Sequence, residues 1–298
     1  MSPTSIEWTD ETWNPVTGCT KVSAGCQHCY AETFAHRQMG PWKGRAFEDV
    51  RCHEERLDAP LHWRNPRRVF VNSMSDLFHP DVPDAFIDRV FAVMAQCPEH
   101  TFQVLTKRPE RMRVFVSRWD PQDLAPLPLP NVWLGVSAEG QATLDTRWHH
   151  LRVTPAAIRF LSLEPLLEPV DFQTMYEYLD TETLVLPDWV VVGGESGPTA
   201  RPCDVAWIRS IIRQCRAAGV PCFTKQLGAR PTGWWSNALG PRIGRVKHPK
   251  GGDPAEWPED LRVREMPERH AIGRDRSASV GGSESAQWLR STYSRRSP

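Results

Sequence analysis

The sequence predicts an α/β fold, a complete or partial (βα) barrel of six to seven parallel strands with an irregular C-terminal extension. Short runs rich in Val, Phe and Leu recur up to residue 228, and each ends in polar or glycine residues. Amphipathic segments of helical period separate several of these runs. The chain has 298 residues, of which 40% are hydrophobic, and this suits one barrel-sized domain followed by a further segment.

The expected elements alternate along the chain. Strands are expected at 68–74, 102–108, 132–138, 159–165, 189–195 and 221–227, with a weaker first strand within 6–15. Helices are expected at 82–98, 109–118, 141–151 and 203–220. Asp204 should cap the last helix and Gly219 should end it. Alternation of this kind indicates parallel βαβ units, whose functional groups gather at the carboxyl ends of the strands.

Composition divides the chain into three parts. Residues 1–228 carry the alternating pattern and form the predicted barrel. In residues 229–267 the pattern dissolves into Gly, Pro, Trp and charged residues, which predicts an irregular extension packed on the barrel. Residues 268–298 are rich in Ser, Gly and Arg, a composition typical of a disordered tail.

Charge and hydropathy limit the kinds of partner. The chain has 36 basic and 36 acidic residues, so no global field draws it toward nucleic acid or an anionic membrane, and a polyanion would have to meet a local patch. No leader pattern is present, and no segment approaches the roughly 18 apolar residues of a membrane span. We therefore expect a cytoplasmic protein with no membrane partner. Thiols stay reduced in that compartment, so clustered cysteines indicate metal binding or catalysis.

Three of the eight cysteines lie close together after the first expected strand. Cys19, Cys26 and Cys29 have the spacing C-x6-C-x2-C. One interpretation is that they are small buried hydrophobes, although core cysteines do not normally crowd into a Gly-containing loop. Another is an iron–sulfur cluster, because Cys thiolates are its usual ligands and a cube held by three of them leaves one iron free to chelate a small molecule.

A structural zinc ion is the third interpretation of the same cysteines. Such a site normally closes with four protein ligands, and His28, His36 or Cys52 could supply the fourth. The cysteines, however, lie at the mouth of a predicted barrel, where functional sites form.

A three-cysteine loop after the first strand of a barrel resembles the radical S-adenosylmethionine superfamily. The common spacing there is C-x3-C-x2-C, and this chain keeps the second interval and lengthens the first. Over residues 5 to 267 the chain is similar to a phage- and prophage-encoded family of unknown function grouped with enzymes akin to spore photoproduct lyase. The segments that carry this likeness include "IEWTDETWNPVTGCTKVSAGCQHCYAE", "FVNSMSDLFH", "VLTKRPERM" and "GGESG".

The resemblance implies an iron–sulfur enzyme. Cys19, Cys26 and Cys29 would hold a [4Fe-4S] cluster whose fourth iron chelates S-adenosyl-L-methionine. Reductive cleavage of that cofactor would give a 5′-deoxyadenosyl radical, with electrons from a flavodoxin- or ferredoxin-type donor and with nucleic acid or a modified base as the substrate. The rival hypothesis is a non-catalytic, zinc-binding phage protein that binds nucleic acid or a protein partner.

The resemblance also implies cofactor contacts at the strand ends. His28 stands where the superfamily often has an aromatic side chain near the adenine. The superfamily's Gly-Gly-Glu after the second strand is replaced by polar residues here, and a literal Gly-Gly-Glu follows a later strand. The expected cofactor-binding residues are His28, Ser73, Ser75, Asp76, Ser137, Glu139, Glu164, Gly193, Gly194 and Glu195.

Three further residues are candidates for catalysis. Lys107 and Lys225 close predicted strands, and a lysine there is costly to bury unpaired, so each should face the barrel mouth and meet a carboxylate or phosphate. Cys203 lies near the same rim and is a candidate hydrogen-atom donor. An isolated cysteine is more commonly an inert small hydrophobe, and this alternative stays open for Cys203.

Overall fold

The structure is a computed structural model that describes most of the chain. It covers residue 4 and residues 6–120, 128–173, 185–233, 235–237, 240–242 and 246–268. The predicted disordered tail, apart from its first residue, lies outside the described residues. None of the helices in these ranges is long and apolar enough to cross a membrane.

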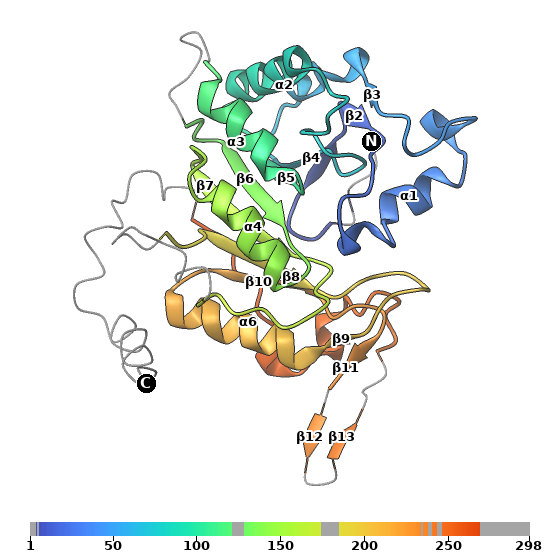
Figure 1. The fold of residues 1–298 in the computed structure, drawn as a ribbon, viewed down its shortest axis with the longest axis vertical. Coiled ribbons are helices and arrows are strands. Elements are labelled where there is room, and N and C mark those ends of the chain that lie inside the picture. The colour runs from blue at the N-terminus through green and yellow to red at the C-terminus, as the bar shows by residue number, and fades with distance from the viewer. Residues whose placement is uncertain are drawn as a thin grey trace, which may run out of the picture.

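A seven-stranded parallel sheet forms the centre of the fold and curves into a half-barrel (Figure 1). The strand order β1-β4-β5-β6-β7-β8-β10 follows the chain, and every neighbouring pair is parallel. The α/β fold with six to seven parallel strands, predicted from the sequence, is confirmed. The strands of this sheet are β1 (Glu11–Trp13), β4 (Arg68–Val71), β5 (Thr101–Thr106), β6 (Val132–Ser137), β7 (Ile158–Leu163), β8 (Trp189–Gly193) and β10 (Cys222–Gln226).

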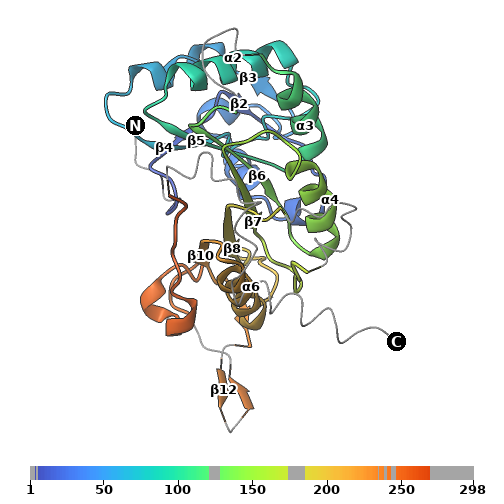
Figure 2. The same cartoon turned by 90° about the vertical axis from the view of Figure 1, so that its left-hand side faces the viewer.

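Helices follow the strands as predicted and cover the outer face of the sheet (Figures 1 and 2). The α-helices are α1 (Tyr30–Ala35), α2 (Asp84–Gln96), α3 (Pro109–Arg118), α4 (Gln141–Leu151) and α6 (Val205–Ala218). Asp204 caps α6 by accepting a hydrogen bond from the Ala206 N–H, and Gly219 ends it with φ 65°. Both expected helix signals are therefore confirmed.

Shorter elements surround the sheet. Two-residue strands pair as β2 (Val16–Thr17) with β3 (Arg51–Cys52) and as β9 (Cys203–Asp204) with β11 (Pro231–Thr232), while β12 (Trp235–Asn237) and β13 (Gly240–Arg242) form a hairpin that projects from the body (Figure 1). The 3₁₀ turns span Ala24–Cys26, Gly40–Trp42, Glu54–Arg56, Ala59–His62, Pro254–Glu256 and Glu259–Leu261.

The concave side of the half-barrel is filled with aromatic rings. Side chains alternate between the two faces of each strand, so one set packs under the helices and the other fills the interior. The interior set includes Trp8, Phe70, Trp133, Phe160, Trp189 and Phe223. Gly135 makes room for one of these rings, because a Cβ at this position would lie 2.4 Å from Phe160. At the carboxyl ends of the same strands, inward positions carry polar side chains such as Ser137, Ser162 and Lys225.

The C-terminal segment packs on the outer edge of β10. The Thr224 N–H donates to the Val263 carbonyl (2.8 Å), and the Glu265 N–H donates to the Cys222 carbonyl (2.9 Å). Trp257 is buried in the main core. This segment therefore supplies backbone partners to a strand that has only β8 beside it in the sheet. The domain boundary at 228/229 stays a prediction.

Candidate functional site

Residues 18–29, named here the cysteine loop, connect the first strands to α1. Gly18 begins the loop with φ 96°, and a Cβ at this position would lie 2.5 Å from the Asp49 carbonyl oxygen, so only glycine fits. The Gly18 N–H donates to the Met74 carbonyl (3.2 Å), and the Cys19 N–H donates to the Phe47 carbonyl (3.0 Å). These bonds fix the direction in which the chain enters the loop.

All three thiols of the loop are free and half-buried. Cys19 and Cys29 pack against the same small apolar cluster, formed by Ala31, Ala35, Trp42 and Phe47. Burial, together with the negative charge of Asp76, raises the pKa of Cys19 to about 11, although Arg108 opposes the shift. In the metal-free protein this thiol therefore keeps its proton at neutral pH, and a metal would have to displace it.

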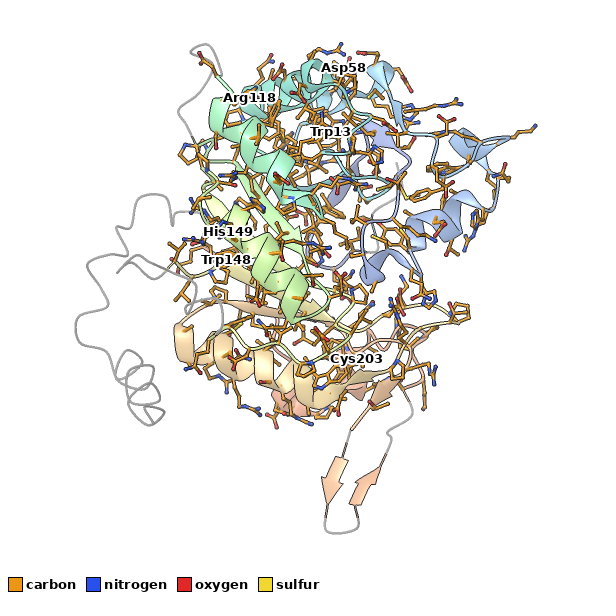
Figure 3. The ribbon with its side chains drawn as sticks, in the orientation of Figure 1. Trp13, Asp58, Arg118, Trp148, His149 and Cys203 are labelled. Atoms are coloured by element: carbon orange, nitrogen blue, oxygen red, sulfur yellow. The ribbon has the colours of Figure 1, made fainter. Side chains whose placement is uncertain are left out.

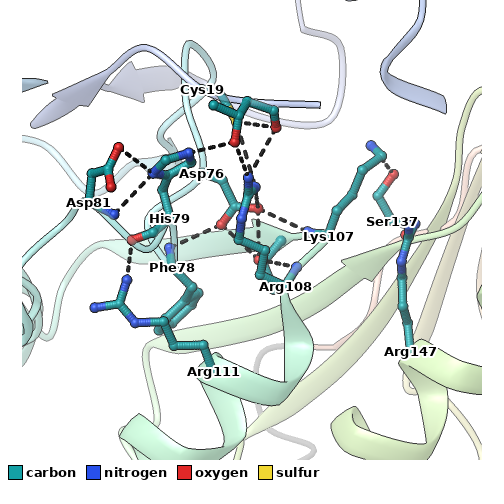
Figure 4. A network of polar contacts seen from close by, with 12 residues as sticks. Cys19, Asp76, Phe78, His79, Asp81, Lys107, Arg108, Arg111, Ser137 and Arg147 are labelled. Carbon is teal, nitrogen blue, oxygen red and sulfur yellow. Dashed lines mark hydrogen bonds and ion pairs between the residues drawn. The ribbon is translucent and has the colours of Figure 1, made fainter. Parts of the chain in front are cut away.

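Arg108, at the start of α3, holds the first part of the cysteine loop (Figure 4). Its Nη2 donates to Thr20 at the carbonyl oxygen (3.0 Å) and at the hydroxyl (2.9 Å), and its Nη1 lies 3.6 Å from Cys19 Sγ. The same guanidinium pairs with the buried Asp76 (3.3 Å). Asp76 also accepts from the Thr106 hydroxyl (2.7 Å). This network ties Cys19 to the end of β5.

His79 binds the same Thr20 hydroxyl that Arg108 contacts. The Asp81 N–H donates to His79 Nδ1 (3.1 Å), so the ring proton is on Nε2, which donates to the Thr20 hydroxyl (2.8 Å; Figure 4). Burial lowers the pKa of His79, and the positive charge of Arg108 lowers it further. His79 therefore acts as a neutral donor.

Glu139, after β6, holds the middle of the cysteine loop. The Gly25 N–H donates to Glu139 Oε1 (3.2 Å), beside Cys26. Arg147 of α4 pairs with the same carboxylate (2.9 Å), and both side chains are buried. Burial by itself would raise the pKa of Glu139, but its polar neighbours, Arg147 and the Gly25 N–H among them, outweigh burial and lower it. A Cβ on Gly25 would lie 3.0 Å from Glu139 Oε2, so the contact requires a small residue.

Glu195, after β8, holds the last part of the cysteine loop. His28 Nδ1 lies 3.0 Å from Glu195 Oε2, beside Cys29. Arg201 donates to the same carboxylate through its backbone N–H (2.8 Å) and its Nε (2.9 Å). Burial by itself would raise the pKa of Glu195, but the bonds from Arg201 and His28 outweigh it and hold this pKa at about 2.

Four polar side chains form a second group at the ends of the strands. Lys225 of β10 places its ammonium 2.8 Å and 2.7 Å from the two carboxylate oxygens of Glu164. The Lys107 ammonium donates to Ser137 Oγ (2.8 Å; Figure 4), whose hydroxyl donates to the Glu164 carbonyl (3.0 Å). Within the described residues no carboxylate lies at ion-pair distance from Lys107 Nζ. Lys107 is therefore a half-buried cation that could meet an anionic ligand.

The other residues predicted to bind the cofactor make structural contacts. Ser73 and Ser75 donate to the Asn14 side chain (3.1 Å) and the Val16 carbonyl (2.9 Å). The Gly194 N–H donates to the Gln226 carbonyl (3.1 Å), and a Cβ at this position would lie 2.4 Å from the Leu227 carbonyl oxygen. Gly193 accepts at its carbonyl from the Leu166 N–H (2.9 Å). The two glycines thus allow β8 and β10 to approach closely.

Cys203 lies apart from the cysteine loop. It belongs to β9, beside α6 (Figure 3), and it is 1% exposed in the main core. Burial raises its pKa to about 12, so it is a protonated thiol. Its neighbour Gly194 packs against it, since a Cβ there would lie 2.9 Å from that of Cys203. In the part of the chain that the structure describes, no hydrogen bond links Cys203 to the three clustered cysteines.

The described residues contain no group of three or more His, Cys, Asp and Glu side chains arranged to hold a metal ion. Of the residues near the loop that could complete a zinc site, two make the following contacts, and Cys52 keeps a free thiol. His28 binds Glu195 through Nδ1, and Cys52 lies in β3, paired with Val16 of β2. His53, next to Cys52, contacts Thr17 through Nε2 (2.7 Å) and Glu55 through Nδ1 (3.0 Å).

Three arginines of the site were not predicted as site residues from the sequence. Arg108 and Arg201 could have been found from their positions next to strand ends, where charged residues tend to face the mouth. Arg147 gives no such signal, because it lies within the pattern of an amphipathic helix. Its burial against Glu139 becomes visible only in three dimensions.

Comparison with known proteins gives one match. The family described as "Protein of unknown function (DUF5131)" matches residues 3–274, which is most of the chain. No curated protein and no solved structure matches the chain.

Proposed function

The chain belongs to the DUF5131 family, and we propose that it is an iron–sulfur enzyme of the radical S-adenosylmethionine type. One observation carries the proposal: three free, half-buried thiols share a single loop whose neighbouring residues are held by the carboxyl ends of a parallel half-barrel. Functional groups gather at this end in α/β folds, because the loops converge there.

The donor set fits a cluster of this kind. Cys19, Cys26 and Cys29 are all free thiols, and Cys thiolates are the usual ligands of iron–sulfur clusters. A four-iron cube presents its irons at separate corners, so its thiolates bind different irons and need not surround one point as the ligands of a single ion do. Three cysteines leave the fourth iron free for S-adenosylmethionine. Cys19, Cys26 and Cys29 would hold such a cluster, which would supply the electron for reductive cleavage of S-adenosylmethionine.

The protein's own residues contribute binding and orientation. Lys107, with Ser137 beside it, can hold a carboxylate or phosphate of the bound ligand, because its charge has no carboxylate partner among the described residues. Lys107 and Ser137, together with the Lys225–Glu164 pair, form a polar surface at the strand ends, named here the polar floor, on which that ligand would lie. The aromatic interior below this floor keeps water out of the half-barrel.

The expected substrate is nucleic acid or a modified base, and the electron donor is of the flavodoxin or ferredoxin type. Both proposals come from the resemblance to radical enzymes. The substrate is tested by mass spectrometry of host and phage nucleic acid after incubation with the reduced, reconstituted protein. A base whose mass changes supports it, and unchanged base masses count against it.

Anaerobic reconstitution with iron and sulfide tests the enzyme proposal. We expect a brown protein with about four irons per chain, as the cube requires, and release of 5′-deoxyadenosine after addition of dithionite and S-adenosylmethionine. Replacing Cys19, Cys26 or Cys29 by Ala should abolish the colour and the bound iron. Cys97→Ala is the matched control, because this cysteine is buried in the core at the end of α2. One colourless zinc per chain with no cofactor cleavage would overturn the proposal in favour of a zinc-binding protein.

A further inference from the structure

We propose that Arg108, Glu139 and Glu195 are positioning residues that together fix the cysteine loop before any metal is bound, with one of them assigned to each thiol. They come from three different strand ends, those of β5, β6 and β8. That the loop receives an iron–sulfur cluster rests on the proposed function. The positioning itself is a property of the metal-free chain.

The three contacts fall at corresponding places along the loop. Arg108 binds Thr20, the residue after Cys19. Glu139 binds the N–H of Gly25, the residue before Cys26. Glu195 binds His28, the residue before Cys29. Each cysteine thus has a direct sequence neighbour that is held by a charged side chain from a different strand.

Each positioning residue is itself fixed by an opposite charge. Asp76 pairs with Arg108, Arg147 pairs with Glu139 and Arg201 pairs with Glu195. The side chains of Arg108, Glu139 and Glu195 are only 11%, 5% and 5% exposed. Buried and already paired in this way, they act as rigid supports for the loop, and their remaining hydrogen-bonding capacity is directed at it.

Other contacts also reach the loop, namely the backbone bonds of Gly18 and Cys19, the His79–Thr20 and Arg201–Gln27 bonds and the Lys21–Glu32 pair. Its only regular element among the described residues is the single 3₁₀ turn Ala24–Cys26, which has no buried residue. Val22 is 44% exposed, and the Lys21 side chain is 50% exposed. Because ligands must be held in place by surrounding hydrogen bonds to bind metal well, loss of such supports typically lowers metal affinity about 10–100-fold.

Hydrogen exchange of the metal-free full-length chain tests the proposal without reference to a cluster. Arg108→Met and Glu195→Ala remove two supports, and exchange in the peptides spanning 18–29 should become about tenfold faster or more, as expected for loss of a charge-assisted hydrogen bond. Glu11→Gln is the matched control, because it changes a buried carboxylate that pairs with Arg67 at the start of β1 and has no hydrogen bond to the loop. Exchange of the loop should be unchanged in this control.

Two further variants change residues of the cysteine loop and keep the buried charge pairs of the half-barrel. Faster exchange in these variants therefore does not arise from loss of a buried charge pair. Thr20→Val removes the hydroxyl that Arg108 and His79 bind, and it leaves the Arg108 bond to the Thr20 carbonyl and the Arg108–Asp76 pair in place. Gly25→Ala pushes the loop away from Glu139, because the added Cβ would lie 3.0 Å from Oε2. Both should accelerate exchange in the loop while α2 and α6 keep wild-type exchange.

Iron uptake separates this proposal from the proposed function. The wild-type chain and the Glu11→Gln control should load iron equally, and the four other variants should load it about 10–100-fold less tightly. If the wild type takes up no iron and the variants still loosen the loop, the positioning stands and the proposed function fails. Unchanged exchange of residues 18–29 in all four variants overturns the positioning, whatever the iron content.

Discussion

At the scale of single residues, the charged groups at the strand ends divide into two sets. One set, Arg108, Glu139 and Glu195, faces the cysteine loop and is bound to it. The other set, Lys107 and Lys225, forms the polar floor with Ser137 and Glu164. The sequence placed Glu139, Glu195 and the two lysines at the mouth, but a residue's type does not reveal which neighbour it meets.

Glu195 should make stability depend on pH in the acidic range. Its pKa in the folded protein is about 2, against an ordinary value of 4.5. A carboxylate with a lowered pKa stabilises the fold above its unfolded-state pKa, and this contribution is lost as the pH falls from 4.5 toward 2. Glu195→Gln should therefore lower the free energy of unfolding by on the order of 3 kcal/mol at pH 7.

Urea denaturation at several pH values measures this difference. The wild type and Glu195→Gln should converge between pH 4.5 and 2, because the wild-type carboxylate becomes protonated there. A difference that stays constant down to pH 2 would show that the ionisation of Glu195 is not the cause.

Lys107 should matter for ligand binding more than for stability. Lys107→Met removes the ammonium that has no carboxylate partner among the described residues, and it keeps most of the side-chain volume. We expect S-adenosylmethionine or an anionic substrate to bind about 10–100-fold more weakly, as for loss of a charge-assisted hydrogen bond. Equilibrium dialysis with the reconstituted protein measures the Kd. The control is Lys250→Met, which changes an exposed lysine near the C-terminal 3₁₀ turns, and a wild-type Kd for Lys107→Met would contradict the assignment.

At the scale of elements, local sequence signals located the strands and helices well. The predicted helices 109–118 and 141–151 coincide with α3 and α4, and Asp204 and Gly219 bound α6 as expected. The predicted strands run one to three residues too far at their carboxyl ends, because the chain leaves the sheet there to enter the loops of the mouth. The pairs β2–β3 and β9–β11 were not predicted, since a two-residue strand is defined by its partner and has no periodicity of its own.

Gly135 should be essential for the packing of β6 against β7. A Cβ there would lie 2.4 Å from the Phe160 ring, which is fully buried and cannot move aside. Gly135→Ala should lower the free energy of unfolding by about 1–3 kcal/mol, the usual range for overpacking. Chemical denaturation measures it, with Gly44→Ala as a comparison because no atom lies within 4 Å of a Cβ at that position, although its φ of 68° also disfavours alanine. A smaller loss for Gly135→Ala than for Gly44→Ala would contradict the packing argument.

At the scale of the whole molecule, the sheet is a half-barrel with two edge strands, β1 and β10. β1 pairs only with β4, and β10 pairs only with β8. The C-terminal segment covers the edge of β10 and inserts Trp257 into the main core, where its Nε1 donates to the Gly251 carbonyl (3.0 Å).

Trp257→Ala should test how much the C-terminal segment contributes to the fold. Trp257 is 2% exposed, and truncation of a buried Trp typically costs about 3–5 kcal/mol. The midpoint of urea unfolding should therefore fall markedly, while Val153→Ala, at a side chain that is 50% exposed, should change it little. Equal effects of the two substitutions would show that the segment is not part of the cooperative unit.

The sequence by itself determined the alternation of strands and helices, their approximate ends and the presence of three cysteines in one loop beside the first strand. These features are local, because periodicity, caps and spacing act over a few residues. Only the tertiary structure decided which side chains meet that loop. Arg108 reaches Cys19 across 89 positions, Glu139 reaches Gly25 across 114 and Glu195 reaches His28 across 167. Contacts over such separations depend on the order and curvature of the strands, and no local pattern records them.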